Sequence, residues 1–210
     1  MLLWNDLYPR HNTFRRRKMK CLKVSLSALL LIAIFILSPL QVLAENGAQL
    51  QDQASQALVR LEILKADKKG SLRLKEKTKR YEFITFVNAA MSYDVEADSA
   101  SADVEFKDLT KKHAAWSQIR AAAAHGLIEA YEDGTIRPDK AITAGDALVI
   151  LMKALGYGND LAGLDHDGIL GMAAELGITS DAAAPKFEDA LLRGTAAIYI
   201  CNFMSIDFKQ

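Results

Sequence analysis

Apolar residues recur at a helical spacing along most of the chain. In six segments they occupy positions i, i+3, i+4 and i+7, which places them on one face of a helix. The segments lie at residues 54–61, 83–90, 119–126, 148–155, 169–176 and 197–204. No stretch alternates apolar and polar residues convincingly, as a half-buried strand does. The pattern therefore predicts an all-α fold.

The six segments pair into three helix–loop–helix units, at about residues 52–92, 104–156 and 165–206. In the middle unit the first helix is expected to end at Gly126, because glycine tolerates the left-handed geometry that follows a helix. The second helix opens at Thr143, with Asp146 three residues on, as in a capping box. Each unit has too little apolar surface to stand alone, so we expect the three to pack together as repeats.

The loop of the middle unit carries residues that set the backbone. Asp133 and Gly134 favour a tight turn. Arg137 precedes Pro138, and a residue in that position is restricted toward extended geometry. The second helix of each unit is expected at about residues 79–91, 143–155 and 193–204.

The N-terminus has the layout of a secretory signal. Residues 24–37 are nearly all apolar, a basic stretch precedes them at residues 15–18, and a small-residue site follows at residues 42–44. We predict a signal peptide at residues 1–44, cleaved after Ala44, and a helical domain at residues 45–210. Met19 is an alternative start. The other interpretation is an uncleaved anchor, although the apolar run is shorter than the roughly 20 residues of a spanning helix.

Removal of the predicted signal peptide would change the net charge of the chain. The whole chain has 26 basic and 26 acidic residues, but residues 1–44 hold seven of the basic and one of the acidic ones. The remaining chain therefore carries 19 basic and 25 acidic residues, a net charge of −6. Residues 65–80 reverse that sign locally, with a net charge of +6. Such a run is usually a solvated face, but here it also favours an anionic partner.

The residues that carry chemistry do not converge on an active site. No histidine has a cysteine or serine partner in a recognisable nucleophile setting, and no zinc-ligand spacing is present. The stretch at residues 165–168 hints at a calcium loop, but Gly163 and Ala174 would then stand at the two main ligand positions. Cys201 would be the one cysteine of the mature chain, so no internal disulfide is expected. We expect no enzyme, no metal site and no cofactor.

The middle unit resembles an S-layer homology repeat. That family's loop reads G-L-I-x-G-Y-x-D-G-T-F-R-P-D, and residues 126–139 read G-L-I-E-A-Y-E-D-G-T-I-R-P-D. Phe106–Leu109, Ile142–Thr143 and Leu155–Tyr157 extend the likeness. In the outer units, Lys79–Phe83 resembles the family segment T-R-x-E-F, and Leu192–Gly194 resembles its T-R-G variant.

The resemblance implies both a fold and a function. Members form a pseudo-threefold helical domain of three repeats and are located at the cell surface or wall. The resemblance therefore implies no nucleic-acid partner, and no membrane partner after the signal peptide is cleaved. Members bind secondary cell-wall polysaccharides attached to peptidoglycan, often anionic and pyruvylated. The family's Arg at each groove suits a carboxylate. Here the resemblance implies a polymer-binding role for Arg80 and Arg193, with Glu82, Lys79 and Arg137 as further candidates.

A second function stays open because some family positions differ. The middle unit has Ala144 at the Arg position. The third unit has Leu192 in place of Thr and Thr195 in place of Glu. These replacements favour a module that docks another envelope protein as a structural component of the cell surface. Arg80, Arg193 and the basic stretch favour the wall polymer.

Overall fold

The computed structural model describes residues 47–179 and 186–209, and all of them belong to one compact unit. The described residues contain no β-strand. Their helices are residues 47–60, α2 (Arg80–Ala90), α3 (Val95–Ser101), α4 (Trp116–Ala124), α5 (Ala144–Ala154), the 3-10 helix η1 (Gly158–Leu161), α6 (His166–Glu175) and α7 (Arg193–Phe203). The all-α expectation is therefore confirmed. Each of the six apolar segments overlaps a helix, whereas α3 and η1 were not expected.

Three backbone segments meet in a closed ring. The N–H of Thr78 donates to the carbonyl of Leu191, Leu191 donates to Ile142, and Ile142 donates back to Thr78, at 2.8–2.9 Å. Thr78, Ile142 and Leu191 thus occupy equivalent positions in the three repeats. This ring is the pseudo-threefold centre that the resemblance implied, and the helices α2, α5 and α7 begin directly after it.

Backbone groups next to the ring complete the first turns of α2, α5 and α7, which are the inner helices of the three repeats. The first N–H groups of a helix have no partner within the helix. The N–H groups of Arg80 and Tyr81 donate to the carbonyls of Lys140 and Pro138 in the next repeat. The same two bonds recur at the start of α5, toward Asp189 and Phe187, and at the start of α7, toward Glu76 and Leu74. The N-cap residues of α2 and α7, Lys79 and Leu192, make no side-chain cap bond, whereas the Thr143 hydroxyl caps α5.

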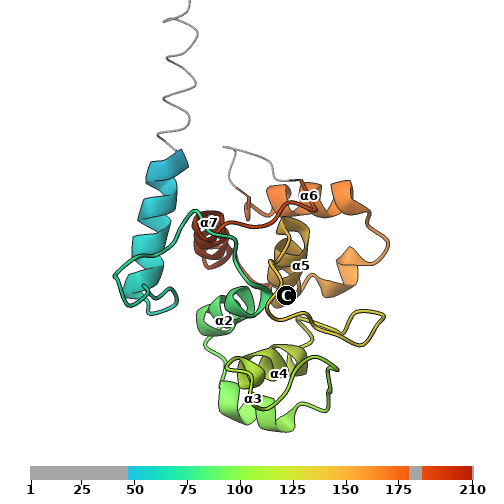
Figure 1. Cartoon of the computed structure of the whole chain (residues 1–210). Helices are drawn as coiled ribbons and strands as arrows, with labels where there is room; N and C mark the ends of the chain where they lie inside the picture. Colours follow the sequence, from blue (N-terminus) through green and yellow to red (C-terminus); the bar gives the residue numbers. More distant parts are fainter. Residues whose placement is uncertain (1–46, 180–185, 210) are drawn as a thin grey trace, which may run out of the picture. The chain divides into compact units, whose positions relative to one another are not determined.

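Each inner helix packs against the outer helix of the following repeat (Figure 1). α2 lies against α4, and α5 lies against α6. The helix at residues 47–60 closes the cycle on α7, where the thiol of Cys201 donates to the carbonyl of Ala54 at 3.5 Å. The core consists of the inner faces, including the fully buried Phe83, Leu148 and Ile200. The repeats are therefore interlocked rather than merely adjacent.

The predicted signal peptide lies outside the described residues. In the part of the chain that the structure describes, none of the helices has the length and apolar character needed to cross a membrane. The same residues hold no cluster of three or more potential metal-ligating side chains.

Candidate functional site

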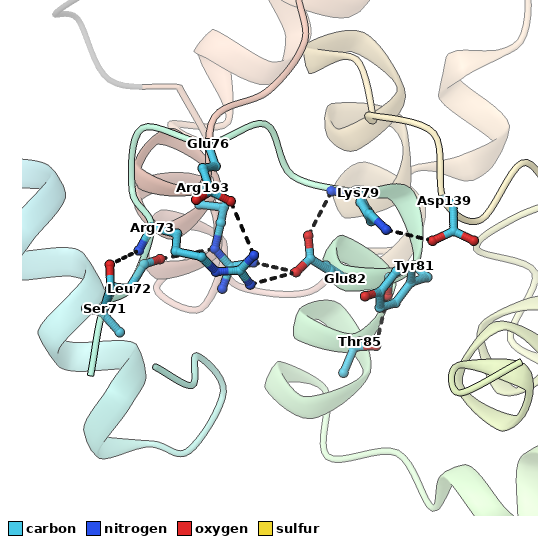
Figure 2. Close-up of polar contacts among 10 residues, drawn as sticks. All are labelled: Ser71, Leu72, Arg73, Glu76, Lys79, Tyr81, Glu82, Thr85, Asp139 and Arg193. Carbon is cyan, nitrogen blue, oxygen red and sulfur yellow. Dashed lines mark hydrogen bonds and ion pairs between the residues drawn. The ribbon is translucent and has the colours of Figure 1, made fainter. Parts of the chain in front are cut away.

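Arg193 is buried at the joint between the third and first repeats (Figure 2). Its side chain is 3% exposed, and its Nη1 donates to Glu82 Oε1 at 2.8 Å. Its Nε donates to the carbonyl of Leu72 at 3.1 Å. Burial lowers the pKa of Arg193, and the negative charge of Glu82 opposes that shift. The guanidinium is therefore fixed in one orientation.

Glu82 joins three partners at the start of α2 (Figure 2). Besides Arg193, its Oε1 accepts from Arg73 Nη2 at 3.3 Å, and its Oε2 accepts from the backbone N–H of Lys79 at 3.0 Å. The last bond is half of a capping box, since a lysine side chain cannot accept the reciprocal bond. Two cations thus converge on one carboxylate, and Glu76 also pairs with Arg73 at 3.2 Å, so the two arginines and two glutamates carry no net charge.

Arg80 occupies the equivalent position at the joint between the first and second repeats. Its side chain is 9% exposed, and its Nη1 donates to Asp146 Oδ2 at 2.8 Å. The hydroxyl of Tyr131 donates to the same oxygen at 3.1 Å, and the Tyr131 ring centroid lies 5.1 Å from the Arg80 guanidinium. Arg80 is therefore covered and already paired.

The third joint, between the second and third repeats, has neither the arginine nor the carboxylate. The backbone ring aligns Ala144 with Arg80 and Arg193, and it aligns Thr195 with Glu82 and Asp146. Phe187 occupies this joint instead. A Cβ atom added to Gly145 would lie 2.4 Å from its ring, and the ring stacks on His166 at 3.8 Å. The replacements at Ala144 and Thr195 therefore leave no unpaired buried charge.

The other two predicted site residues, Lys79 and Arg137, lie on the surface near the joint between the first and second repeats. Lys79 Nζ donates to Asp139 Oδ1 at 2.8 Å, which raises the pKa of Lys79 and lowers that of Asp139. Arg137 pairs with Asp133 at 2.9 Å, and its guanidinium lies 4.1 Å from the centroid of the Tyr131 ring. Arg193 and Glu82 thus form one cluster, whereas Arg80, Lys79 and Arg137 lie around a different joint.

The expected extended backbone at Arg137 is wrong, because its φ is 53°. The carboxylate of Asp108 explains the difference. It accepts the N–H groups of Ile136 and Arg137, both at 2.8 Å, and so holds the turn in this conformation. Arg73 is the equivalent residue of the first repeat and has a φ of 52°.

A groove of about 530 Å³ runs beside the Arg193 cluster. It is lined by the loop of the first repeat, by one face of α2 and by a residue of α4. Its basic lining residues are Lys65, Arg73 and Arg193, and its acidic lining residues are Glu62, Asp67 and Glu82. Of the predicted site residues, Arg193 and Glu82 line this groove. Arg73 was missed, although its place in the basic stretch and its alignment with Arg137 were signals for it.

Comparison with known proteins gives two findings. Residues 105–148 match the family model described as the S-layer homology domain. A stretch of 131 residues is 22% identical to the Middle cell wall protein of Brevibacillus brevis. This stretch is 62% of the present chain but 12% of that protein, so the chain spans a small part of its relative.

Proposed function

We propose that this chain, whose residues 105–148 match the S-layer homology domain, attaches non-covalently to an anionic secondary polymer linked to peptidoglycan. The likeness to a cell wall protein supports a place at the cell surface or wall and a structural rather than a catalytic role. We propose further that the chain is exported and that acidic sugars, pyruvylated ones among them, are the units it recognises.

The groove beside Arg193 is the observation that carries the proposal. Arg193 is fixed by Glu82 and Leu72, so it contributes a rigid positive charge at the base of the groove. Arg73 is 36% exposed, and its contacts to Glu76 and Glu82 are 3.2 and 3.3 Å long. Charge-assisted N–H···O bonds are usually about 2.7–2.9 Å. Arg73 is thus the group that a ligand carboxylate can engage.

The surroundings of the groove favour an anion as well. Lys65 lines it, and the exposed Lys68, Lys69 and Lys75 belong to the same basic stretch. The remaining chain is acidic, so attraction of a polyanion depends on this local charge. Arg80 becomes the second candidate, because Tyr131 and Asp146 cover it. The backbone N–H groups that begin α2 bind neighbouring carbonyls and so do not add to anion binding there.

Docking of another envelope protein is the alternative function. The third joint favours it, because Ala144 and Thr195 have replaced the charged pair and Phe187 fills the space. This joint therefore has no guanidinium for a carboxylate. A partner protein would contact this face independently of the groove beside Arg193.

Co-sedimentation with bacterial sacculi tests the polymer proposal. Arg73→Ala should weaken binding by about 1.5–3 kcal/mol, the range for hydrogen bonds to a charged group. Arg137→Ala is the matched control, because Arg137 has the same backbone conformation, a similar exposure of 39%, and a position at another joint. Binding of the wild type should weaken as salt rises, since exposed charges are screened.

Stripping the secondary polymer from the sacculi separates the two functions. The polymer proposal requires that the wild-type protein sediments with intact sacculi and stays in solution with stripped ones. If the wild type and both variants sediment equally with intact sacculi at every salt concentration, or if none of them sediments, the polymer proposal fails and protein docking takes its place.

A further inference from the structure

A second cavity, of about 310 Å³, lies within the second repeat. Its lining residues all fall between Val104 and Arg120, in the segment after α3 and in the first turns of α4. Trp116 and Arg120 are four residues apart and so share one face of α4. Gln118, which lines the groove beside Arg193, is about 200° around the helix from Trp116. The cavity is therefore separate from that groove.

The walls of this cavity are largely apolar and are held in place. Phe106 is buried, and Leu109 and Trp116 are half-buried. The guanidinium of Arg120 donates to three carbonyls of residues 99–104 and lies 4.8 Å from the centroid of the Trp116 ring. One rigid group thus holds this segment beside the ring, so the cavity is already formed before a ligand arrives. Its volume is at the lower end of the range of ligand pockets, about 300–1,000 Å³, so it suits a small group.

Two charged side chains of the cavity are not engaged by the protein. Lys111 and Glu105 are exposed, and neither side chain has an ion pair or hydrogen bond among the described residues. Lys111 Nζ lies 5.9 Å from the centroid of the Trp116 ring. With Arg120, the lining has two cations and one anion, a net charge of +1. Because Arg120 already binds carbonyls, the Lys111 ammonium is the group for an anionic part of a ligand.

The segment that contains Glu105 also has unpaired backbone groups. The N–H groups of residues 103–106 and the carbonyls of Asp103 and Glu105 make no hydrogen bond to another described residue. An extended peptide binds through main-chain groups of this kind, with pockets for its side chains, and terminal carboxylates are a recurring anchor in peptide recognition. A peptide end therefore matches the cation, the apolar walls and the backbone together.

We propose that this cavity binds the C-terminal end of an extended segment of another protein. The terminal carboxylate pairs with Lys111, an apolar last side chain packs against Trp116, and the peptide backbone pairs with residues 103–106. Glu105 favours a basic side chain shortly before the end. The site is independent of polymer binding, because it uses no residue of the groove beside Arg193.

The fluorescence of Trp116 gives a direct measurement, because the chain has only one other tryptophan, Trp4. The probe is an acetylated hexapeptide that ends in leucine with a free carboxylate and has arginine two residues earlier. The same peptide with a C-terminal amide is the matched control. The free acid should shift the emission saturably, and the amide should need at least a tenfold higher concentration. Trp116→Phe should abolish the shift, which assigns it to the cavity.

Lys111→Ala should weaken binding of the free acid by about 10- to 100-fold, as loss of a hydrogen bond to a charged group does. Lys112→Ala should bind like the wild type, because Lys112 is also exposed but does not line the cavity. Thermal unfolding verifies that each variant folds.

Three results would overturn this proposal: equal binding of the acid and the amide, wild-type binding by Lys111→Ala, or no shift by the free acid at millimolar concentration. Tighter binding of a peptidoglycan stem peptide that ends in D-alanine would also overturn it, because the partner would then be the wall itself. None of these results changes the expected sedimentation of the wild type with sacculi, so the proposed function is tested separately.

Discussion

Arg193 and Glu82 come from different repeats, and the burial of one depends on the other. A buried cation without its partner is strongly destabilising. Glu82→Gln keeps the shape of the side chain and its bond to Lys79 but removes the negative charge. We expect the free energy of unfolding to fall by about 2–3 kcal/mol, as measured by chemical denaturation.

Glu76→Gln is the control for this change. Glu76 also pairs with Arg73, but its side chain is 58% exposed. Exposed pairs contribute little, so the change should be within about 0.5 kcal/mol. Equal effects of the two substitutions would mean that burial of Arg193 does not depend on Glu82.

The buried Tyr199 should make the stability of the protein depend on pH in the alkaline range. Burial raises its pKa from 10.0 to about 12, and its hydroxyl has no hydrogen-bond partner among the described residues. The uncharged form is the protonated one. The stability that it contributes is therefore complete below pH 10 and is lost as the pH rises through 12, by about 2–3 kcal/mol.

Tyr199→Phe tests this effect. Because no bond is lost, the variant should be as stable as the wild type at pH 7 or slightly more stable. Denaturant unfolding at pH 7 and pH 11.5 should show a smaller alkaline loss in the variant. An equal loss in the two proteins would assign the alkaline instability to other groups.

The sequence identified only part of the candidate site. Arg193 and Glu82 were found because they stand in segments that resemble a family motif. Asn88 and Gln118, which also line the groove, were not found, because an amide in a helix has no local signal and their contact joins two repeats across 30 residues. The burial of Arg80 was also hidden, since it depends on Tyr131 and Asp146 from the next repeat.

At the scale of elements, apolar spacing predicted the helices that bury a broad face. It missed α3, whose sequence VEADSAS has one large apolar residue. This helix depends on other interactions. Asp94 caps its start, and His125 pairs with Asp98 at 2.8 Å. Arg120 of α4 donates to the carbonyls of Ser99, Ala102 and Val104 around its end.

Arg120→Lys should therefore loosen α3. One ammonium group cannot replace a planar guanidinium that binds three carbonyls. Amide hydrogen exchange in α3 should become about 10- to 100-fold faster, which corresponds to the loss of one or two such bonds. Exchange in α5 should not change.

The same substitution at Arg60 is the control, because Arg60 is exposed on the helix at residues 47–60. It should leave the exchange of α3 amides at the wild-type rate. If Arg120→Lys also has no effect, the capping by Asp94 and the packing on α4 are sufficient for α3.

At the scale of the whole molecule, the backbone ring couples the three repeats. Gly145 donates to the carbonyl of Phe187 at 2.9 Å, and an added Cβ would collide with the Phe187 ring. Gly145→Ala should cost about 1–3 kcal/mol, as overpacking does. Because the repeats interlock, amides of α2, α5 and α7 should lose protection together under conditions where exchange reports global unfolding.

Gly171→Ala is the matched control in α6, where an added Cβ meets nothing within 4 Å. Alanine is the better helix former, so this variant should be more stable by about 0.5–1 kcal/mol. Loss of protection in α5 alone after Gly145→Ala would show that the repeats unfold independently.

The cyclic arrangement also sets an order of events during synthesis. The bond from Cys201 to Ala54 joins residues 147 apart in the chain, and Arg193 reaches Glu82 across 111 residues. Contacts between such distant residues are slow to form, because a long loop must close first. A nascent chain that has not reached α7 leaves the groove side of the first repeat open and Glu82 without Arg193. The last repeat to be synthesised is therefore the one that completes the first.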